Sequence, residues 1–177
     1  MNHADHVHLL RRGVAAPGGV WADLGAGGGA FTLALAELLG PGATIYAVDR
    51  DRGALRQLDA AMRDRFPAVT LHTLAADFTQ PLPVPDLPLD GVVMANSLHF
   101  VRRKEPVLGL VRGYLKPNAP LLLVEYNTDR GNVWVPHPLS FGTWRALAAR
   151  CGFTRTDLLA TRPSSFLREF FAAASYG

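Results

Sequence analysis

Residues 20–31 read VWADLGAGGGAF, an apolar run that ends in an aspartate and leads into a glycine-dense turn. An amphipathic segment follows at once, so the pattern predicts a buried strand, a tight turn and the start of a helix. Glycine tolerates positive φ angles and, because it has no Cβ, lets a ligand approach the backbone closely. A helix N-terminus adds unpaired N–H donors and a partial positive charge. The stretch therefore predicts a site for a nucleotide-like ligand against the first strand.

Two nucleotide-binding patterns fit this stretch. Gly25-x-Gly27-x-x-Ala30 matches the dinucleotide fingerprint, with Asp49 about 20 residues further on as the acid that would hold a ribose. The pattern D-x-G-x-G-x-G that begins at Asp23 resembles the first motif of class I S-adenosylmethionine-dependent methyltransferases. Asp23 favours the second pattern, because a carboxylate repels a pyrophosphate but suits the positive amino group of a methionine moiety. Capping of the following helix is the structural alternative for Asp23.

Length and composition indicate one globular domain. The chain has 177 residues, of which 49% are hydrophobic and 19% charged. It shows no apolar run of membrane-spanning length and no apolar signal region, and its single cysteine excludes an internal disulfide, so we expect a cytoplasmic location. The net charge is +3, but the basic residues are dispersed. We expect the densest run, Arg102-Arg103-Lys104, to be a solvated helix start, and we do not expect a nucleic-acid partner.

Beyond residue 31 the chain alternates apolar strands with amphipathic helices. The strand-like runs lie at 44–48, 69–74, 89–95 and 121–126. Such alternation predicts a parallel sheet with right-handed crossovers, and a closing hairpin around residues 162–164 must insert its last strand antiparallel. The proline-rich run 81–88 is expected to be an irregular connection where many α/β folds place a helix. The predicted fold is a single α/β domain over 1–177: a Rossmann-like, seven-stranded, mostly parallel sheet with helices on both faces and an antiparallel C-terminal hairpin.

Two segments are candidates to cover the ligand. Apolar residues at helical spacing predict a short amphipathic helix within 1–16, which we expect to lie over the cleft as a lid. The aromatic, proline-containing loop 127–140 would lie on the substrate side. The first segment carries His3, His6 and His8, but it has no i, i+4 pair and no cysteine partner, so we expect an exposed helix end and no metal.

Acidic residues follow the second and third predicted strands. Asp49 can accept from both hydroxyls of a ribose; capping of the next helix is its alternative role, which Asp51 could fill equally well. Asp77 could accept from the exocyclic amine of an adenine, and Phe78 offers an apolar wall. Ligands bind at the carboxyl ends of strands in open α/β sheets, so both acids belong to the expected site.

From residue 20 to residue 175 the chain resembles class I S-adenosylmethionine-dependent methyltransferases, of the small kind similar to those of ubiquinone and menaquinone biosynthesis. The resemblance rests on the glycine-rich motif, the two acids, the exit Asn96-Ser97-Leu98-His99 from the fourth strand, the turn 113–117 and the closing hairpin. It implies S-adenosylmethionine as the cofactor. The residues that it implies for cofactor binding are Asp23, Gly25, Gly27, Gly29, Asp49, Arg50, Asp77, Phe78 and Asn96.

The implied reaction is SN2 displacement of the sulfonium methyl by an O, N, S or C nucleophile of a small-molecule acceptor. The cofactor carries the reactive bond, so the protein mainly aligns the two partners. His99 is the candidate base for an acceptor that must lose a proton, and packing at the start of the next helix is its alternative role. Three other functions stay open: an NAD-dependent oxidoreductase, a non-catalytic S-adenosylmethionine-binding protein and an RNA methyltransferase.

Overall fold

The computed structural model describes all 177 residues. Its strands are β1 (Val20–Leu24), β2 (Thr44–Asp49), β3 (Thr70–Ala75), β4 (Gly91–Ala95), β5 (Pro120–Tyr126), β6 (Arg155–Ser164) and β7 (Arg168–Tyr176). Its helices are α1 (His3–Arg11), α2 (Ala30–Leu39), α3 (Arg52–Arg65), the 3₁₀ helix η1 (Leu98–Phe100), α4 (Glu105–Tyr114) and α5 (Phe141–Arg150). None of these helices combines the length and the apolar character needed to cross a bilayer.

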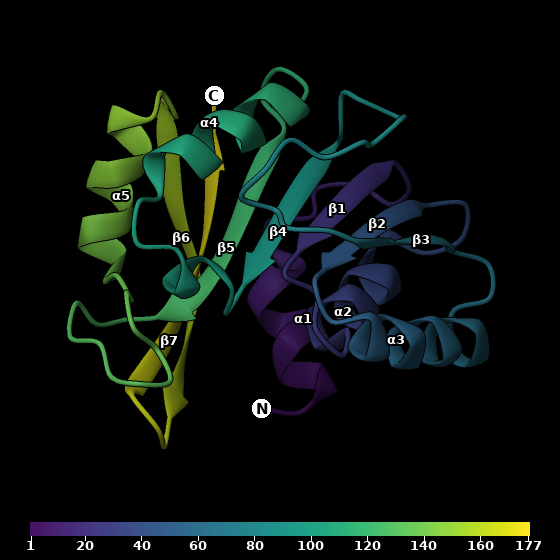
Figure 1. The fold of residues 1–177 in the computed structure, drawn as a ribbon, viewed down its shortest axis with the longest axis horizontal. Coiled ribbons are helices and arrows are strands. Elements are labelled where there is room, and N and C mark those ends of the chain that lie inside the picture. Colours follow the sequence, from purple (N-terminus) through teal and green to yellow (C-terminus); the bar gives the residue numbers. More distant parts are fainter.

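The seven strands form one sheet in the order β3-β2-β1-β4-β5-β7-β6 (Figure 1). Strands β1 to β5 pair in parallel, and β7 pairs antiparallel with both β5 and β6. This confirms the predicted mostly parallel sheet with an antiparallel C-terminal hairpin. The chain moves outward from β1 to β3 and then returns to the other side of β1 with β4, so the strand order reverses between β1 and β4. Ligands in open α/β sheets bind at such a reversal, outside the carboxyl ends of the strands.

Helices cover both faces of the sheet, as predicted. Helices α1, α2 and α3 pack on one face and α4 and α5 on the other (Figure 1). The strands feed both layers because successive side chains point to opposite faces: Trp21 belongs to the first hydrophobic cluster and Ala22 to the second. Strands buried on both sides explain why β4 and β5 read as continuous apolar runs.

The connection between β3 and β4 contains no helix, as the proline-rich sequence indicated. Leu82 and Val84 are buried and close the sheet face at this place. Asp86 accepts a hydrogen bond from the Tyr46 hydroxyl (2.5 Å), and the Leu82 N–H donates to the Tyr114 hydroxyl (3.0 Å). With so thin a cover, no residue of the edge strand β3 is buried.

The closing hairpin turns later than its sequence suggested. Pro163 was expected in the turn, but it lies within β6 opposite Glu169, and the chain reverses at residues 165–167. The reason is the position of β6 at the edge of the sheet, since an edge strand tolerates a residue that has no N–H to donate.

Helix α1 begins with a capping box, in which Asn2 and Asp5 satisfy each other's backbone N–H groups. Its apolar face, with Val7, Leu9 and Leu10, is buried and belongs to the same hydrophobic cluster as the apolar residues of α2. The predicted amphipathic helix is therefore present, and it forms part of the core.

Candidate cofactor site

Two adjoining cavities open at the carboxyl ends of the central strands. The first, here the β2-side cavity, has a volume of about 360 Å³ and is lined by residues that include Asp49, Arg50, Phe78 and Phe100. The second, the α1-side cavity, has a volume of about 420 Å³ and is lined by residues that include His6, Asp23 and Phe31. Three residues, Gly25, Gly27 and Asn96, line both cavities. The two together form one site around the glycine turn.

The glycine turn is tied to the end of β2. The backbone N–H groups of Gly25 and Ala26 donate to the Val48 carbonyl (2.8 and 3.0 Å), and the Gly27 N–H donates to Asp49 Oδ2 (2.8 Å). The Asp49 carboxylate therefore shapes the turn as well as facing the β2-side cavity.

The three glycines of the motif have different physical roles, although all have positive φ angles. A Cβ added at Gly25 would lie 2.4 Å from Ser97 Cβ, whereas one at Gly27 would meet nothing within 4 Å. Gly27 thus leaves open space in the cavity wall, where a ligand can approach the backbone. A Cβ at Gly29 would lie 2.2 Å from Leu58 Cδ1, and Gly29 lines neither cavity. Gly29 thus allows α2 to pack against α3, and a role for it in the site stays a prediction.

Asp23 is buried, at 1% exposure, with one oxygen bonded and one free. Its Oδ2 accepts from the Thr32 hydroxyl (2.7 Å), while Oδ1 has no hydrogen-bond partner. Burial raises the pKa of Asp23 to about 6, against the opposing effect of the Thr32 hydrogen bond. Asp23 caps no helix, because the N-cap of α2 is Gly29.

Asn96, which lines both cavities, carries a second unpartnered oxygen. Its Oδ1 is buried and accepts no hydrogen bond, and its backbone has a φ of 53°, a left-handed conformation that asparagine tolerates. Buried oxygens of this kind are costly unless a donor reaches them. The ammonium group of a methionine moiety carries such donors, so Asp23 and Asn96 fit the amino-acid end of S-adenosylmethionine.

Asp49 does not cap helix α3, which was its alternative role. Asp51 caps α3, accepting from the N–H groups of Gly53 and Ala54. Asp49 accepts from the backbone N–H groups of Gly27 and Asp51, one on each oxygen (2.8 Å each). Each oxygen keeps a further lone pair for a ligand hydroxyl.

Asp77 lies beside the β2-side cavity and does not line it. Its Oδ1 accepts from the backbone N–H and the hydroxyl of Thr79, and these bonds hold its pKa below the ordinary value. Its Oδ2 lies 3.6 Å from Arg50 Nη1. Asp77 thus orders two lining residues, Arg50 and Thr79, and Phe78 completes the wall between them.

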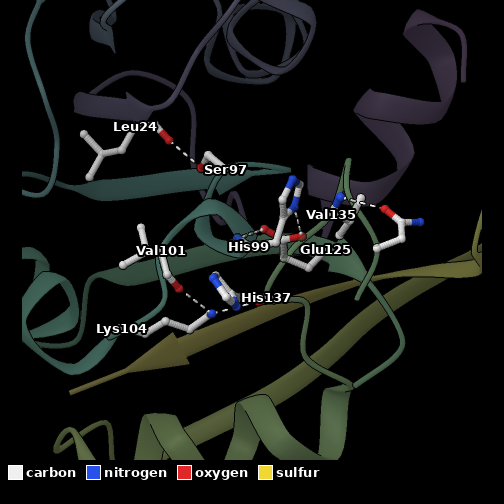
Figure 2. A network of polar contacts seen from close by, with 9 residues as sticks. Leu24, Ser97, His99, Val101, Lys104, Glu125, Val135 and His137 are labelled. Carbon is white, nitrogen blue, oxygen red and sulfur yellow. Dashed lines mark hydrogen bonds and ion pairs between the residues drawn. The ribbon is translucent and has the colours of Figure 1, made fainter. Parts of the chain in front are cut away.

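His99 is buried against an acid that sequence reasoning missed. Its Nδ1 lies 2.7 Å from Glu125 Oε2, and its backbone N–H donates to Glu125 Oε1 (3.1 Å), as Figure 2 shows. Glu125, on β5, is fully buried, and His99 is 3% exposed and lines neither cavity. Its ring lies 4.3 Å, between centroids, from that of Phe100, which lines the β2-side cavity. The available signal was a single charged residue in the apolar run 121–126.

Lys104 differs from the expectation of a solvated helix start, whereas Arg102 and Arg103 are exposed as expected. Lys104 is 7% exposed, and its ammonium group donates to the carbonyls of Val101 (2.7 Å) and His137 (2.8 Å) (Figure 2). Burial lowers its pKa, opposed by the negative charge of Glu125. The His137 N–H also donates to the His99 carbonyl (3.0 Å). The loop 127–140 is thereby fastened to the segment that follows β4.

Comparison with known proteins gives the site a family. Residues 22–121 match a family model described as "Methyltransferase domain". The ubiquinone/menaquinone biosynthesis C-methyltransferase UbiE of Azotobacter vinelandii is 30% identical over 123 residues, which are 67% of this chain and 48% of that protein. UbiE of Shewanella frigidimarina is 27% identical over 123 residues, 70% of this chain and 49% of that protein. The chain thus spans about half the length of these curated relatives.

Solved structures show the same fold. The YcgJ protein from Bacillus subtilis has a TM-score of 0.77 at 12% identity, with 98% of both chains covered. A SAM-dependent methyltransferase from Aquifex aeolicus has a TM-score of 0.73 at 17% identity, covering 96% of this chain and 89% of that one. The family match covers more than half of the chain, and it favours the methyltransferase pattern over the dinucleotide pattern in the glycine turn. The chain therefore belongs to the methyltransferase domain family, with S-adenosylmethionine as the cofactor that this family implies.

Proposed function

We propose that this chain transfers the methyl group of S-adenosylmethionine to a small-molecule acceptor. The main support is the pair of buried, unpartnered oxygens, Asp23 Oδ1 and Asn96 Oδ1, beside a turn whose Gly27 leaves its wall open. This arrangement suits a zwitterionic amino acid joined to a nucleoside, whereas a pyrophosphate would be repelled by Asp23.

The residues divide the cofactor between the two cavities. In the β2-side cavity, Asp49 would accept from the ribose hydroxyls, and Phe78 would pack beside the adenine, with Asp77 and Arg50 at its edge. In the α1-side cavity, Asp23 and Asn96 would accept from the ammonium group, as argued above. Gly25 and Gly27 lie between the two.

When bound, S-adenosylmethionine supplies an electrophilic sulfonium methyl, which an O, N, S or C nucleophile takes by SN2 displacement. The protein's part is to hold the acceptor in line and to exclude water, and alignment alone can lower a barrier by roughly 7–11 kcal/mol in favourable systems. The UbiE relatives are named C-methyltransferases, so a carbon acceptor is the first class to test.

For an acceptor that must lose a proton, we propose His99 as the base and Glu125 as the residue that orients it. With Nδ1–H facing the carboxylate, the free acceptor of the ring is Nε2. His99 does not line the β2-side cavity, whereas the exposed Phe100 ring beside it does, so this role requires Phe100 to move and open a path to the imidazole.

The remaining features are proposals of the same kind. The loop 127–140, fastened by Lys104, would cover the acceptor side, and α1 would cover the amino-acid end of the cofactor, since His6 lines the α1-side cavity. A cytoplasmic location suits a chain with one cysteine, Cys151.

The test is to incubate the purified protein with S-adenosylmethionine and a panel of phenolic, enolisable-carbon, amine and thiol acceptors, and to follow S-adenosylhomocysteine and methylated product by mass spectrometry. We expect stoichiometric formation of both with at least one acceptor class. Tight cofactor binding without transfer to any class, with or without RNA, would contradict the proposal and favour a non-catalytic binding protein. Transfer to RNA alone would contradict the small-molecule acceptor.

A further inference from the structure

The amino-acid end of S-adenosylmethionine carries a carboxylate as well as an ammonium group, and the two need opposite partners. Two residues that line the α1-side cavity, Asp23 and Asn96, each have a buried Oδ1 without a hydrogen-bond partner. A carboxylate cannot bind there without repulsion from Asp23. The cavity must therefore offer donors elsewhere if it is to hold the whole group.

Backbone donors are available at the start of α2. This ten-residue helix has no side-chain cap and no acid of its own in its first turn, so no residue of the helix itself compensates the positive end of its dipole. The first helical bond runs from Leu33 N–H to the Gly29 carbonyl, which leaves the N–H groups of residues 30–32 without a backbone acceptor. Ala30 and Phe31, in this first turn, line the α1-side cavity.

One ionisable donor joins them from another element. His6, on α1, lines the same cavity, and its ring lies 4.6 Å, between centroids, from the ring of Phe31. The imidazole thus lies beside the Phe31 side chain, in the same cavity that Asp23 and Asn96 line, and can supply the positive charge that a carboxylate there would need. Sequence reasoning had assigned it to an exposed helix end.

We propose that His6 and the N-terminus of α2 bind the carboxylate of the cofactor's methionine moiety, and that His6 takes up a proton as it does so. This inference rests on the proposed function. It makes α1 part of the binding site, because the His6 side chain contacts the amino-acid end of the ligand.

The charges around His6 support proton uptake. Burial lowers the pKa of His6, as do the N-terminal ammonium group and His3, while Asp5 opposes them. The charged groups that act on it are the N-terminal ammonium group of Met1, His3 and Asp5 on its own segment, and Asp23 on β1 lines the same cavity. Two further charges lie one contact away: Arg162 on β6 pairs with Asp5, and Glu37 on α2 pairs with His3. In the free protein at neutral pH the imidazole is therefore mostly neutral, and a carboxylate beside it would raise its pKa.

The experiment compares two ligands by isothermal titration calorimetry at pH 7.5, where Asp23, with a pKa of about 6, is already mostly ionised. S-adenosylhomocysteine carries the amino-acid group, whereas 5′-methylthioadenosine lacks it. Titrations in phosphate and in Tris buffer give the number of protons taken up, because the two buffers ionise with different enthalpies. We expect uptake with S-adenosylhomocysteine and none with 5′-methylthioadenosine.

Substitution identifies the group that takes up the proton. His6→Gln should abolish the uptake and weaken S-adenosylhomocysteine at least about tenfold, while leaving the affinity for 5′-methylthioadenosine unchanged. The matched variants His3→Gln and His8→Gln, on the same helix, should behave as wild type. Equal weakening of both ligands by His6→Gln would indicate a general loss of structure and overturn the proposal, as would unchanged proton uptake. If neither ligand binds wild-type protein, the proposed function itself fails.

Discussion

The Asp23 carboxyl group is buried, and its protonation should make the free energy of unfolding depend on pH. Its folded pKa of about 6 lies above the ordinary value of 3.8, so between these pH values the folded state binds more protons than the unfolded state. The contribution of Asp23 to the free energy of unfolding therefore falls as pH rises through this window. We compare the free energy of unfolding of Asp23→Asn with that of wild type at each pH. The difference, variant minus wild type, should be about 2–3 kcal/mol larger at pH 7.5 than at pH 3.5.

Urea denaturation of the two proteins across this pH range measures the difference, and the other carboxyl groups cancel from it. A difference that does not change with pH would contradict a raised pKa for Asp23. Asp23→Asn should also bind S-adenosylmethionine more weakly, which separates the stability of the free protein from its function.

Asp49 and Asp51 offer a matched pair of neighbouring acids with different roles. Asp49→Asn keeps an acceptor for the Gly27 N–H but removes the carboxylate from the β2-side cavity, so we expect S-adenosylhomocysteine to bind about ten- to a hundredfold more weakly. Asp51→Ala should lower the free energy of unfolding by about 1 kcal/mol, through loss of the α3 cap, with little change in affinity. Calorimetric titration and urea denaturation of both variants check this, and the reverse pattern would remove Asp49 from the site.

His99 should affect turnover and not cofactor binding. We expect His99→Ala to slow methyl transfer to a hydroxyl or acidic-carbon acceptor by about 10²–10⁴-fold, since it removes the proposed base, while the affinity for S-adenosylhomocysteine stays nearly unaltered. Single-turnover kinetics measure the effect, with His72→Ala on the exposed strand β3 as the control. Unchanged turnover in His99→Ala would contradict a role as base and would show that His99, bonded to Glu125, serves only in packing.

At the scale of the element, the glycines of the turn have different roles: Gly29 allows helix packing, whereas Gly28 faces open space. Gly29→Ala should lower the free energy of unfolding by about 1–3 kcal/mol, because its Cβ would lie 2.2 Å from Leu58 Cδ1 at a φ of 86°. Gly28→Ala is the matched control, since a Cβ there meets nothing within 4 Å and the backbone has no positive φ. Thermal and urea unfolding of the two variants decide the point; equal stability would contradict the packing role of Gly29.

Elements whose pattern is local were predictable from sequence. The strand–helix alternation, the amphipathic helix α1 and the irregular connection 81–88 all follow from apolar spacing and from turn residues. The position of Pro163 was not predictable, because a proline is equally at home in a turn and on an edge strand, and only the sheet order shows that β6 is an edge.

The site was predictable where it depends on strand ends, and not where it depends on contacts between distant segments. Asp49 and Asn96 lie at the cavities because strand ends converge at one edge of the sheet. In the sequence, Lys104 looks like one more charge in a basic run. It can be buried because its ammonium group donates to two carbonyls, one of them 33 residues away. His6 likewise enters the site only because α1 packs beside α2.

At the scale of the whole molecule, the central question is which nucleotide binds at the edge of the sheet. The order reversal between β1 and β4 brings both cavities to one edge, and both glycine patterns in the sequence would use that edge. The family match and the unpartnered oxygens of Asp23 and Asn96 favour an adenosyl amino acid over a dinucleotide. A ligand that binds only the folded state must stabilise the entire domain.

The most direct test is a thermal-unfolding titration of the purified protein with S-adenosylmethionine, S-adenosylhomocysteine and NAD in parallel. At a hundred times its dissociation constant, a ligand adds about 2.7 kcal/mol to the free energy of unfolding, which raises the melting temperature of a domain this size by about 5–10 °C. We predict stabilisation by the two adenosyl compounds and none by NAD at the same concentration. Stabilisation by NAD alone would contradict the assignment and show that the glycine turn holds a dinucleotide.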